Sequence, residues 1–509
     1  ARGWPDVRYV GELYFQAHRG VLTSQAKTKL GNRKSELALR EAEFWGVAAR
    51  ALRAFDFSAT TLDAAWKTVL LNQFHDILPG SSIHRVYEEA EAAYTQVIAE
   101  AKRVTESALE SLASRPDRSS ETCQVCEALT VFNSLSWERV AMVALPDGWS
   151  GAQDVGGNPL PVQKIGDTFY TDAAVPASGW TTLKPGTPEE GEVLVKATPT
   201  TLENDVLRLT FDAFGQITSI FDKETQRELT AGPCNSFKMY KDVPSRFDAW
   251  DIDSMYEQTP VALDAPATID VVTEGPLVAA LLVKRTLHNS EMTQRISLRR
   301  GSRRVTFRTA INWQERHKLL KVAFPVDIHA NEAIHEIQFG HIRRPNHRSR
   351  PFDADRFEVA NHKWTALAEE NRGCAVLNDS KYGVNVHGNS INLTLLKSPL
   401  APDMTADLGV QTFYYAFYAW NGSFAGSDVV REGYDLNVPV QTAPGDGGTA
   451  SLFSVDAPNV IIETVKPAED DSGDIIVRMY EAKRMATRCT LTTTLPLGAA
   501  ALTDMLENI

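Results

Sequence analysis

Apolar residues between positions 24 and 114 recur at steps of three and four, which is the period of an amphipathic helix. The spacing predicts three helices, which contain about residues 37–52, 62–74 and 83–112. Pro79-Gly80-Ser81-Ser82 separates the last two, and serine is a common N-cap, so Ser82 is expected to cap the third helix. Three helices with short connections predict a small antiparallel bundle.

The period of the apolar pattern changes to two after a polar linker at residues 114–121. Residues 206–211 and 216–220 alternate around the turn Asp212-Ala213-Phe214-Gly215, which predicts a β-hairpin. Short strands with frequent Gly and Pro turns continue to about Thr494, and no long amphipathic helix is expected among them. The chain is therefore predicted to be a multidomain α+β protein, in which a three-helix bundle precedes a large antiparallel β-sandwich or two stacked ones.

Composition narrows the possible partners of the protein. The 509 residues are 43% hydrophobic and carry a formal net charge of −13, so the chain is globular and a poor ligand for nucleic acid. No apolar run reaches the roughly 18 residues that a membrane helix needs. Five cysteines are few and odd in number, which indicates a reducing, cytoplasmic compartment. Cys123 and Cys126 form a CxxC without a second pair, and we interpret them as a chance pair in a linker.

The segment Leu71-Asn72-Gln73-Phe74-His75-Asp76-Ile77-Leu78-Pro79-Gly80-Ser81-Ser82 carries the most suggestive chemistry. It places His75 and Asp76, a nitrogen ligand and a carboxylate, at the end of an apolar helix. A single histidine at a helix end is usually a surface or capped residue, because zinc sites take three or four ligands.

Two other clusters have a structural and a functional interpretation. Asp248, Asp251 and Asp253 surround Trp250, and strand spacing would put the last two carboxylates on one face beside a sugar platform; a solvated acidic loop is the favoured alternative. The evenly spaced His335, His341 and His347 would suit a metal if they lined one strand. Neighbouring arginines oppose a cation there, so polar strand-end roles are favoured.

Several further stretches have an unusual composition and occur in one particular order. Together with residues 71–82 they resemble glycoside hydrolase family 38, the alpha-mannosidases, over nearly the whole chain. These stretches are residues 11–20 with Thr23-Ser24-Gln25, then Lys29-Leu30-Gly31-Asn32-Arg33-Lys34, Arg246-Phe247-Asp248-Ala249-Trp250-Asp251-Ile252-Asp253, Glu336-Ile337-Gln338-Phe339-Gly340-His341 with Arg344-Pro345, residues 377–383, and Lys397-Ser398-Pro399.

The resemblance implies a galactose-mutarotase-like supersandwich fold and a zinc-dependent retaining alpha-mannosidase that hydrolyses α-linked mannosyl residues of oligosaccharides. One zinc ion is held in the family by two His and two Asp. His75 maps to one of these four ligands, and Asp76 maps to a residue that touches sugar hydroxyls. Arg19 and Asp251 are weaker substrate-binding candidates, and for Arg19 a structural salt bridge is the favoured role.

The nucleophile, the general acid and the other three zinc ligands belong in the family to an N-terminal α/β domain. A retaining glycosidase needs two carboxyl groups about 5 Å apart, so the chain alone is expected to be inactive. The expected partners are a mannose-containing oligosaccharide and that catalytic domain, without nucleic acid or membrane. The surface left exposed would favour a homo-oligomer.

The domain organisation follows from these patterns and the resemblance. Residues 1–23 are expected to end the catalytic α/β domain, 24–115 to form the helical bundle, 122–195 a small β domain, and 196–509 the large sandwich. The alternative function from another class is a non-catalytic carbohydrate-binding or structural β module.

Overall fold

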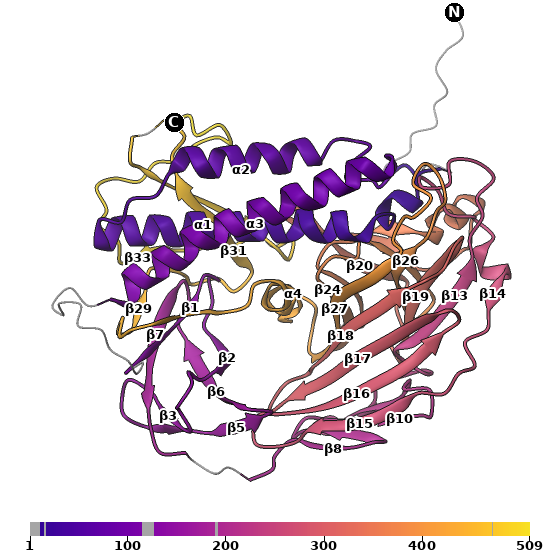
Figure 1. Cartoon of the computed structure of the whole chain (residues 1–509), viewed down its shortest axis with the longest axis horizontal. Coiled ribbons are helices and arrows are strands. Elements are labelled where there is room, and N and C mark those ends of the chain that lie inside the picture. The colour runs from indigo at the N-terminus through magenta and orange to yellow at the C-terminus, as the bar shows by residue number, and fades with distance from the viewer. Residues whose placement is uncertain (1–10, 15–16, 115–126, 189–191, 471) are drawn as a thin grey trace, which may run out of the picture.

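Three helices form the predicted bundle (Figure 1). The computed structural model describes residues 11–14, 17–114, 127–188, 192–470 and 472–509. In it α1 spans Ala26–Arg53, α2 Ala59–Asn72 and α3 His84–Ala113. Ser58 caps α2, because its Oγ accepts a hydrogen bond from the N–H of Thr61 at 3.1 Å. Among the residues described here, no helix combines the length and the apolar character that a membrane crossing requires.

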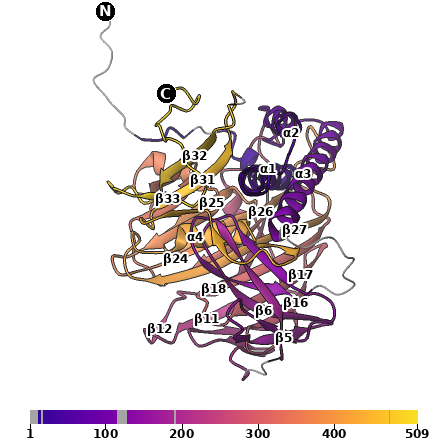
Figure 2. The same cartoon turned by 90° about the vertical axis from the view of Figure 1, so that its left-hand side faces the viewer.

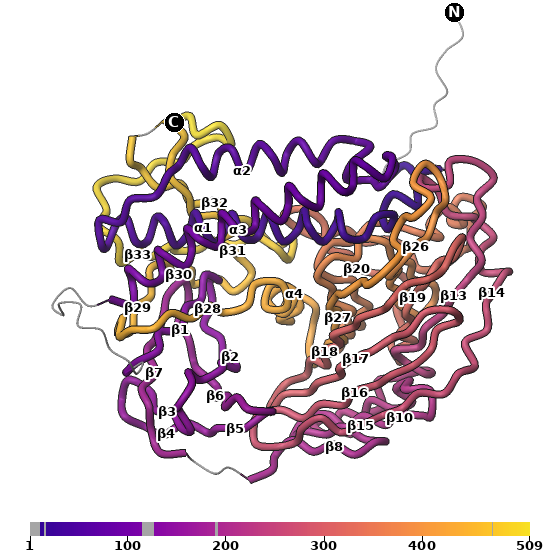
Figure 3. Tube along the Cα trace, viewed as in Figure 1, coloured from indigo at the N-terminus to yellow at the C-terminus, as the bar shows by residue number. Residues whose placement is uncertain are grey.

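A small β region lies beneath one end of the bundle (Figures 1 and 3). It consists of a three-stranded sheet in the order β2-β6-β5 and a six-stranded sheet in the order β28-β1-β7-β3-β4, with β29 also paired to β7. Two of these strands, β28 and β29, come from the range that the sequence assigned to the large sandwich. The bounds are β1 Leu129–Asn133, β2 Arg139–Ala144, β3 Ala152–Gln153, β4 Pro159–Leu160, β5 Val162–Ile165, β6 Thr168–Val175, β7 Gly179–Pro185, β28 Gln441–Pro444 and β29 Ala450–Ser451.

A large sandwich of antiparallel sheets forms the rest of the body. The nine-stranded sheet has the order β15-β16-β17-β18-β27-β24-β23-β20-β21, and its partner the order β14-β13-β19-β26-β25-β22. Phe324 of the smaller sheet stacks on Phe417 of the larger one with ring centroids 5.9 Å apart, so the sheets pack face to face. A five-stranded sheet, β12-β11-β10-β9-β8, shares their apolar core. This arrangement confirms the predicted fold class.

The strands of the large sandwich have the following bounds. In the nine-stranded sheet they are β15 Thr268–Thr273, β16 Val278–Leu287, β17 Ser290–Arg299, β18 Arg304–Trp313, β20 Glu332–Ile337, β21 Gly340–Pro345, β23 Trp364–Ala368, β24 Arg372–Asn378 and β27 Gly409–Asn421. In its partner they are β13 Ser236–Lys241, β14 Pro260–Val261, β19 Lys318–Pro325, β22 Val359–Ala360, β25 Gly383–His387 and β26 Ser390–Lys397. In the third sheet they are β8 Lys196–Thr198, β9 Thr201–Glu203, β10 Leu207–Phe211, β11 Ile217–Asp222 and β12 Arg227–Glu228, and the antiparallel pairing of β10 with β11 confirms the predicted hairpin.

The helices share one core with the small sheet and with the C-terminal strands. Phe44 of α1 packs edge to face against Phe453, and Trp45 packs in the same way against Phe132 of β1. The C-terminal strands form two hairpin-like pairs, β31 (Val460–Pro467) with β32 (Ile475–Glu481) and β30 (Phe453–Val455) with β33 (Leu491–Thr493). Figure 2 shows β31 and β32 beside the bundle, and the bundle is therefore covered by β structure from two distant parts of the sequence.

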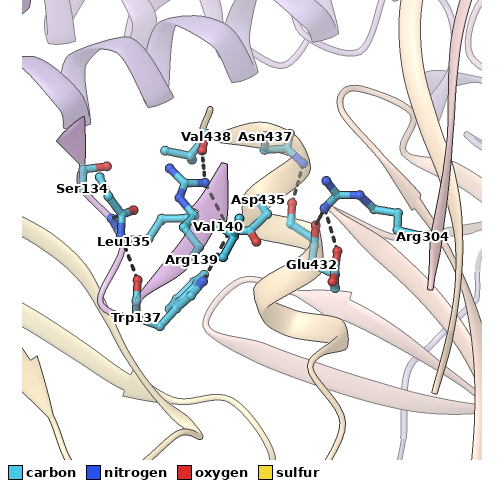
Figure 4. Close-up of polar contacts among 12 residues, drawn as sticks. Ser134, Leu135, Trp137, Arg139, Val140, Arg304, Glu432, Asp435, Asn437 and Val438 are labelled. Atoms are coloured by element: carbon cyan, nitrogen blue, oxygen red, sulfur yellow. Dashed lines mark hydrogen bonds and ion pairs between the residues drawn. The ribbon is translucent and has the colours of Figure 1, made fainter. Parts of the chain in front are cut away.

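A short helix, α4 (Val429–Asn437), connects the small and the large β regions (Figure 4). Arg139 of β2 donates from Nη1 to the carbonyl oxygen of Val438 at 2.7 Å and to Oδ1 of Asp435 at 3.2 Å. On the opposite side, Arg304 of β18 donates to Oε2 of Glu432 at 2.6 Å. Both arginine side chains are largely buried, so these charge-assisted hydrogen bonds fix the two β regions against one helix.

Candidate functional site

A glycine and a set of hydrogen bonds fix the segment that joins α2 to α3. Gly80 has a φ of +91°, and a Cβ there would lie 2.3 Å from the carbonyl oxygen of Ser24, so only glycine fits. The N-cap of α3 is Ile83, which has no side-chain cap hydrogen bond. The prediction that Ser82 caps this helix is therefore wrong. Its hydroxyl instead donates to the backbone oxygen of Asp76 at 2.8 Å.

Asp76 lies at the centre of this turn. Its backbone oxygen also accepts hydrogen bonds from the Tyr87 hydroxyl and the Ser81 N–H, both at 3.2 Å. Its Oδ1 accepts a further one from the Ser81 hydroxyl at 3.0 Å. The backbone of Asp76 is thus anchored, while 41% of its side chain stays exposed. The carboxylate is therefore held in place, and its exposed part can still accept a hydrogen bond from a hydroxyl group of a ligand.

His75 projects from the same turn. Its side chain is 77% exposed, and its Nε2 lies 3.4 Å from Oδ2 of Asp76. The imidazole also packs against the ring of Phe74, with centroids 4.2 Å apart. An exposed imidazole beside a carboxylate can bind a metal ion or hydrogen-bond to a ligand. The structure places both predicted residues together at a helix end and leaves their predicted roles open.

Lys29 is a buried residue of this site that the sequence interpretation did not single out. From the first turn of α1, its Nζ donates to the carbonyl oxygens of Ser24 at 2.5 Å and Leu78 at 2.7 Å. Burial lowers the pKa of this ammonium to about 7, and the nearby Asp407 opposes the change. Two backbone segments meet on one ammonium group, so Lys29 fixes the position of the turn that carries His75. The sequence signal for Lys29 was its place in the stretch 29–34, which resembles the family but gave this side chain no role.

The loop at residues 246–253 contacts the same region from the β-sandwich side. The backbone oxygen of Trp250 accepts a hydrogen bond from the N–H of Gly20 at 2.9 Å, and that of Ala249 accepts one from the Ser24 hydroxyl at 2.7 Å. A Cβ on Gly20 would lie 2.6 Å from the backbone oxygen of Asp251, so the contact requires glycine. The loop and the His75 turn are thus both fixed to residues 19–29.

The aspartates of this loop do not share one strand face. Residues 246–255 form turns and irregular backbone, so strand spacing does not align Asp251 and Asp253, and the segment is a loop, as the favoured alternative has it. Asp248 has a structural position, since its Oδ2 accepts a hydrogen bond from the N–H of Leu400 at 2.6 Å and lies 3.0 Å from Nε2 of His317. Asp251 is partly exposed, and its Oδ1 accepts a hydrogen bond from the N–H of Ile252. Its substrate role stays a prediction.

Arg19 lies beside the same loop and is 9% exposed. Its Nη2 donates to the backbone oxygen of Asp355 at 3.0 Å, and its guanidinium lies 5.7 Å from the ring centroid of Phe357. Burial lowers its pKa, while the charges of Asp355 and Asp251 oppose that change. The geometry favours a structural role for Arg19. Its partners are a backbone carbonyl and an aromatic ring, whereas the sequence interpretation favoured a salt bridge.

The three evenly spaced histidines do not lie on one strand. His335 is in β20 and His341 in the adjacent β21, both are buried, and His347 follows at the surface. Nδ1 of His335 lies 3.1 Å from the Thr365 hydroxyl, and Nδ1 of His341 lies 3.0 Å from the Ala482 carbonyl oxygen. Even spacing does not align them, because the chain turns back between the first two, and the disfavoured metal alternative therefore lacks its geometric basis. The CxxC of Cys123 and Cys126 lies outside the described residues.

The described part of the chain supplies at most a fraction of a zinc site. Within it, no group of three or more His, Cys, Asp or Glu side chains is arranged to hold a metal ion. His75 has the right chemistry and exposure for one ligand, and a closed zinc site takes four. His75 therefore fits the one zinc ligand that the resemblance implies, and a complete zinc site would need further ligands from outside the described residues.

Known structures and sequences identify the type of protein that has this architecture. An alpha-mannosidase from Enterococcus faecalis V583 superposes with a TM-score of 0.78 at 17% identity, over 97% of this chain and 66% of that one. A second protein from Enterococcus faecalis, of glycosyl hydrolase family 38, gives 0.77 at 17% identity over 96% and 68%. At this identity the likeness shows the fold, a helical bundle set on stacked β-sandwiches.

Family descriptions match three parts of the sequence. Residues 16–112 match the alpha mannosidase middle domain, 202–405 the glycosyl hydrolases family 38 C-terminal domain, and 459–509 the family 38 C-terminal beta sandwich domain. Human alpha-mannosidase 2C1 is 36% identical over 98% of this chain, and alpha-mannosidase G of Dictyostelium discoideum is 32% identical over 96%. The chain belongs to glycoside hydrolase family 38. It spans about half the length of these relatives, 48% and 49%.

Proposed function

We propose that this chain forms the middle and C-terminal parts of a zinc-dependent retaining alpha-mannosidase, which hydrolyses α-linked mannosyl residues of oligosaccharides or glycans. The single observation that carries the proposal is the exposed pair His75 and Asp76 on a segment whose backbone is held by partly buried hydrogen bonds. Relatives called alpha-mannosidases that match nearly all of the chain support the same substrate class. The nucleophile, the general acid and the other zinc ligands come, in this proposal, from residues outside the chain.

The proposal gives the two residues separate tasks. His75 supplies one imidazole ligand, and the bound zinc would supply a Lewis acid beside the reacting sugar. Asp76 accepts a hydrogen bond from a sugar hydroxyl and thereby orients the ring. A rigid backbone serves both tasks, because displacement of a positioning group by about 1 Å can cost a hundredfold in rate.

A cytoplasmic location belongs to the same proposal. The cysteines that the described residues contain, Cys234, Cys374 and Cys489, are free thiols, and the first two are buried. Free thiols are typical of a reducing compartment. Microscopy of the whole protein fused to a fluorescent protein tests this location, and fluorescence confined to a membrane-bound compartment would contradict it.

Substitution of His75 in the whole protein tests the zinc assignment. The His75→Ala variant should lose most of its bound zinc and at least a hundredfold in turnover of an aryl α-mannoside. His347→Ala, which removes another exposed histidine, is the matched control and should change neither quantity. Proton NMR of the first product formed should show the α-anomer for a retaining reaction. A His75→Ala variant with one zinc per chain and normal turnover would refute the proposal.

A further inference from the structure

A large cavity lies between part of the helical bundle and part of the C-terminal β-hairpin, beside the core that the two share. It has a volume of about 1200 Å³, which exceeds the range of about 300–1,000 Å³ usual for small-ligand pockets. Its walls come from α1 and α2 on one side and from β31, β32 and the β20–β21 turn on the other, and Figure 2 shows β31 and β32 next to the helical bundle. Its lining includes Thr60 at the start of α2 and Leu78 and Pro79, which follow His75 in the turn between α2 and α3.

A row of amide and carboxylate groups lines the inner end of the cavity. Nε2 of Gln73 donates hydrogen bonds to Oε1 of Glu36 at 2.9 Å and to Oδ1 of Asn32 at 3.1 Å. Gln73 lies two residues before His75, so this row and the candidate site share one backbone segment. Planar groups of this kind bind pairs of neighbouring hydroxyls, because they offer acceptors and donors at fixed spacing.

Aromatic side chains line the same cavity. Phe339, on the β20–β21 turn, is 63% exposed and packs edge to face with Tyr480, with ring centroids 5.8 Å apart. The indole N–H of Trp66 donates to Oε1 of Glu43 at 2.9 Å. These rings therefore offer apolar surface beside polar groups, the combination that binding pockets for amphipathic ligands use.

The charged groups of the cavity wall are mostly compensated by the protein itself. Nζ of Lys363 lies 3.0 Å from Oε1 of Glu336 and 4.3 Å from the ring centroid of Tyr434. Nζ of Lys466 lies 3.0 Å from Oε1 of Glu507. Paired charges leave no large excess of one sign for a phosphate or a basic peptide, and they favour a neutral ligand that is rich in hydroxyl groups.

We propose that this cavity is a second saccharide-binding site, which takes a neutral oligosaccharide of several mannosyl units away from the reacting sugar. The choice of mannose as the sugar rests on the proposed function, whereas the site itself rests on the cavity and its lining. Its volume of about 1200 Å³ suits a chain of sugar units better than a single one. The site would hold a glycan on the protein beside the His75 turn.

Titration calorimetry of the 1–509 chain with an unreactive α-linked mannotetraose tests this site. The chain should bind the oligosaccharide without any catalytic partner, and inorganic phosphate should not bind. Phe339→Ala should weaken binding about tenfold. Phe214→Ala is the matched control, because it also removes an exposed phenylalanine from a hairpin turn but lies outside the cavity, and it should leave affinity unchanged. Glu36→Gln, which keeps the side-chain shape, should weaken binding independently.

The outcomes separate this site from the proposed function. Absence of binding by 1–509 while the whole protein hydrolyses mannosides would overturn the second site alone. If Asp76→Asn weakens binding whereas Phe339→Ala and Glu36→Gln leave it unchanged, the oligosaccharide binds at the candidate site. This result would also overturn the second site. Binding that depends on Phe339 and Glu36 would support the site even if the whole protein lacked mannosidase activity.

Discussion

At the scale of single residues, the candidate site depends on groups that never touch its surface. Lys29 holds the carbonyl oxygens of Ser24 and Leu78, and Tyr87 holds that of Asp76. These hydrogen bonds are buried or partly buried, where a lost partner costs about 1–3 kcal/mol. The exposed pair can therefore keep a fixed geometry although its own side chains have few neighbours.

Asp76→Asn should reduce sugar binding far more than stability. The amide keeps an Oδ1 acceptor for the Ser81 hydroxyl, and the backbone hydrogen bonds stay in place. Loss of a charged acceptor for a substrate hydroxyl costs about 1–3 kcal/mol, so kcat/KM of the whole protein should fall about ten- to a hundredfold. Steady-state kinetics and thermal unfolding measure the two effects, with Asp56→Asn as an exposed control. Unchanged kinetics with a large fall in Tm would show a structural role.

Glu43 should make stability depend on pH. Burial raises the pKa of its carboxyl group from 4.5 to about 7, and the hydrogen bond from Trp66 opposes the change. Between these pH values the folded state keeps a proton that the unfolded state releases, so the free energy of unfolding falls as pH rises from about 4.5 to about 7. The loss amounts to about 3 kcal/mol.

Glu43→Gln should remove this dependence, because glutamine stays neutral in both states and still accepts from the Trp66 N–H. Urea unfolding at pH 5 and pH 8 measures the difference. The variant should gain stability over the parent at pH 8 and little at pH 5. An equal difference between variant and parent at both pH values would refute a raised pKa.

At the scale of elements, close packing of α1 on α3 sets the shape of the bundle. A Cβ on Gly31 of α1 would lie 2.5 Å from Cδ2 of Tyr94 in α3, and the Tyr94 side chain is itself buried. Glycine weakens a helix interior by about 1 kcal/mol relative to alanine, so its presence here indicates that contact outweighs helix propensity.

Gly31→Ala should destabilise the protein despite the gain in helix propensity. Overpacking costs about 1–3 kcal/mol in a filled interior, which exceeds the gain of about 1 kcal/mol. The urea midpoint of unfolding reports the net effect. Lys102→Ala on the exposed side of α3 adds a good helix former without a clash and is the control. A higher midpoint for Gly31→Ala would contradict the packing argument.

At the scale of the whole molecule, the 1–509 chain should not hydrolyse an aryl α-mannoside. The proposed function gives this chain one zinc ligand, His75, and no cluster of three metal-binding side chains occurs in the parts of the chain that the structure describes. A single histidine would bind zinc weakly, because stable sites take three or four protein ligands. Assays of 1–509 with added zinc, beside the whole protein, test this expectation. Equal turnover would show that the chemistry lies within these residues.

Association of the chain is a second expectation at this scale. Leu71, Phe74 and Ile83, around the His75 turn, are exposed to 69%, 53% and 58%. Contiguous exposed apolar residues favour contact with another protein surface. Sedimentation of 1–509 should show a mass that rises with concentration, and the Phe74→Ser variant should reduce that rise. A strictly monomeric parent chain would contradict the expectation.

The main helical and strand regions and their order could be predicted from the sequence, because apolar periodicity is local and reports which side of a helix or strand is buried. The sequence motifs also indicated the family, and they singled out His75 and Asp76 as candidate site residues. The sequence did not reveal the role of Lys29, because a lysine on a helix face is usually solvated and its two carbonyl partners depend on the fold. For the aspartates at 248–253 the sequence left a strand and a loop as alternatives and favoured the loop, and turns shape that segment.

Tertiary structure alone decided which elements meet. Residues 441–451 return across about 300 positions to complete the small sheet with β1 and β7, a pairing that no local pattern encodes. The cavity between α1, α2 and the β31–β32 hairpin arises in the same way, from segments far apart in sequence that pack with a gap. The physical reason is that periodicity identifies an apolar face, whereas the partner of that face is selected by shape and charge across the whole molecule.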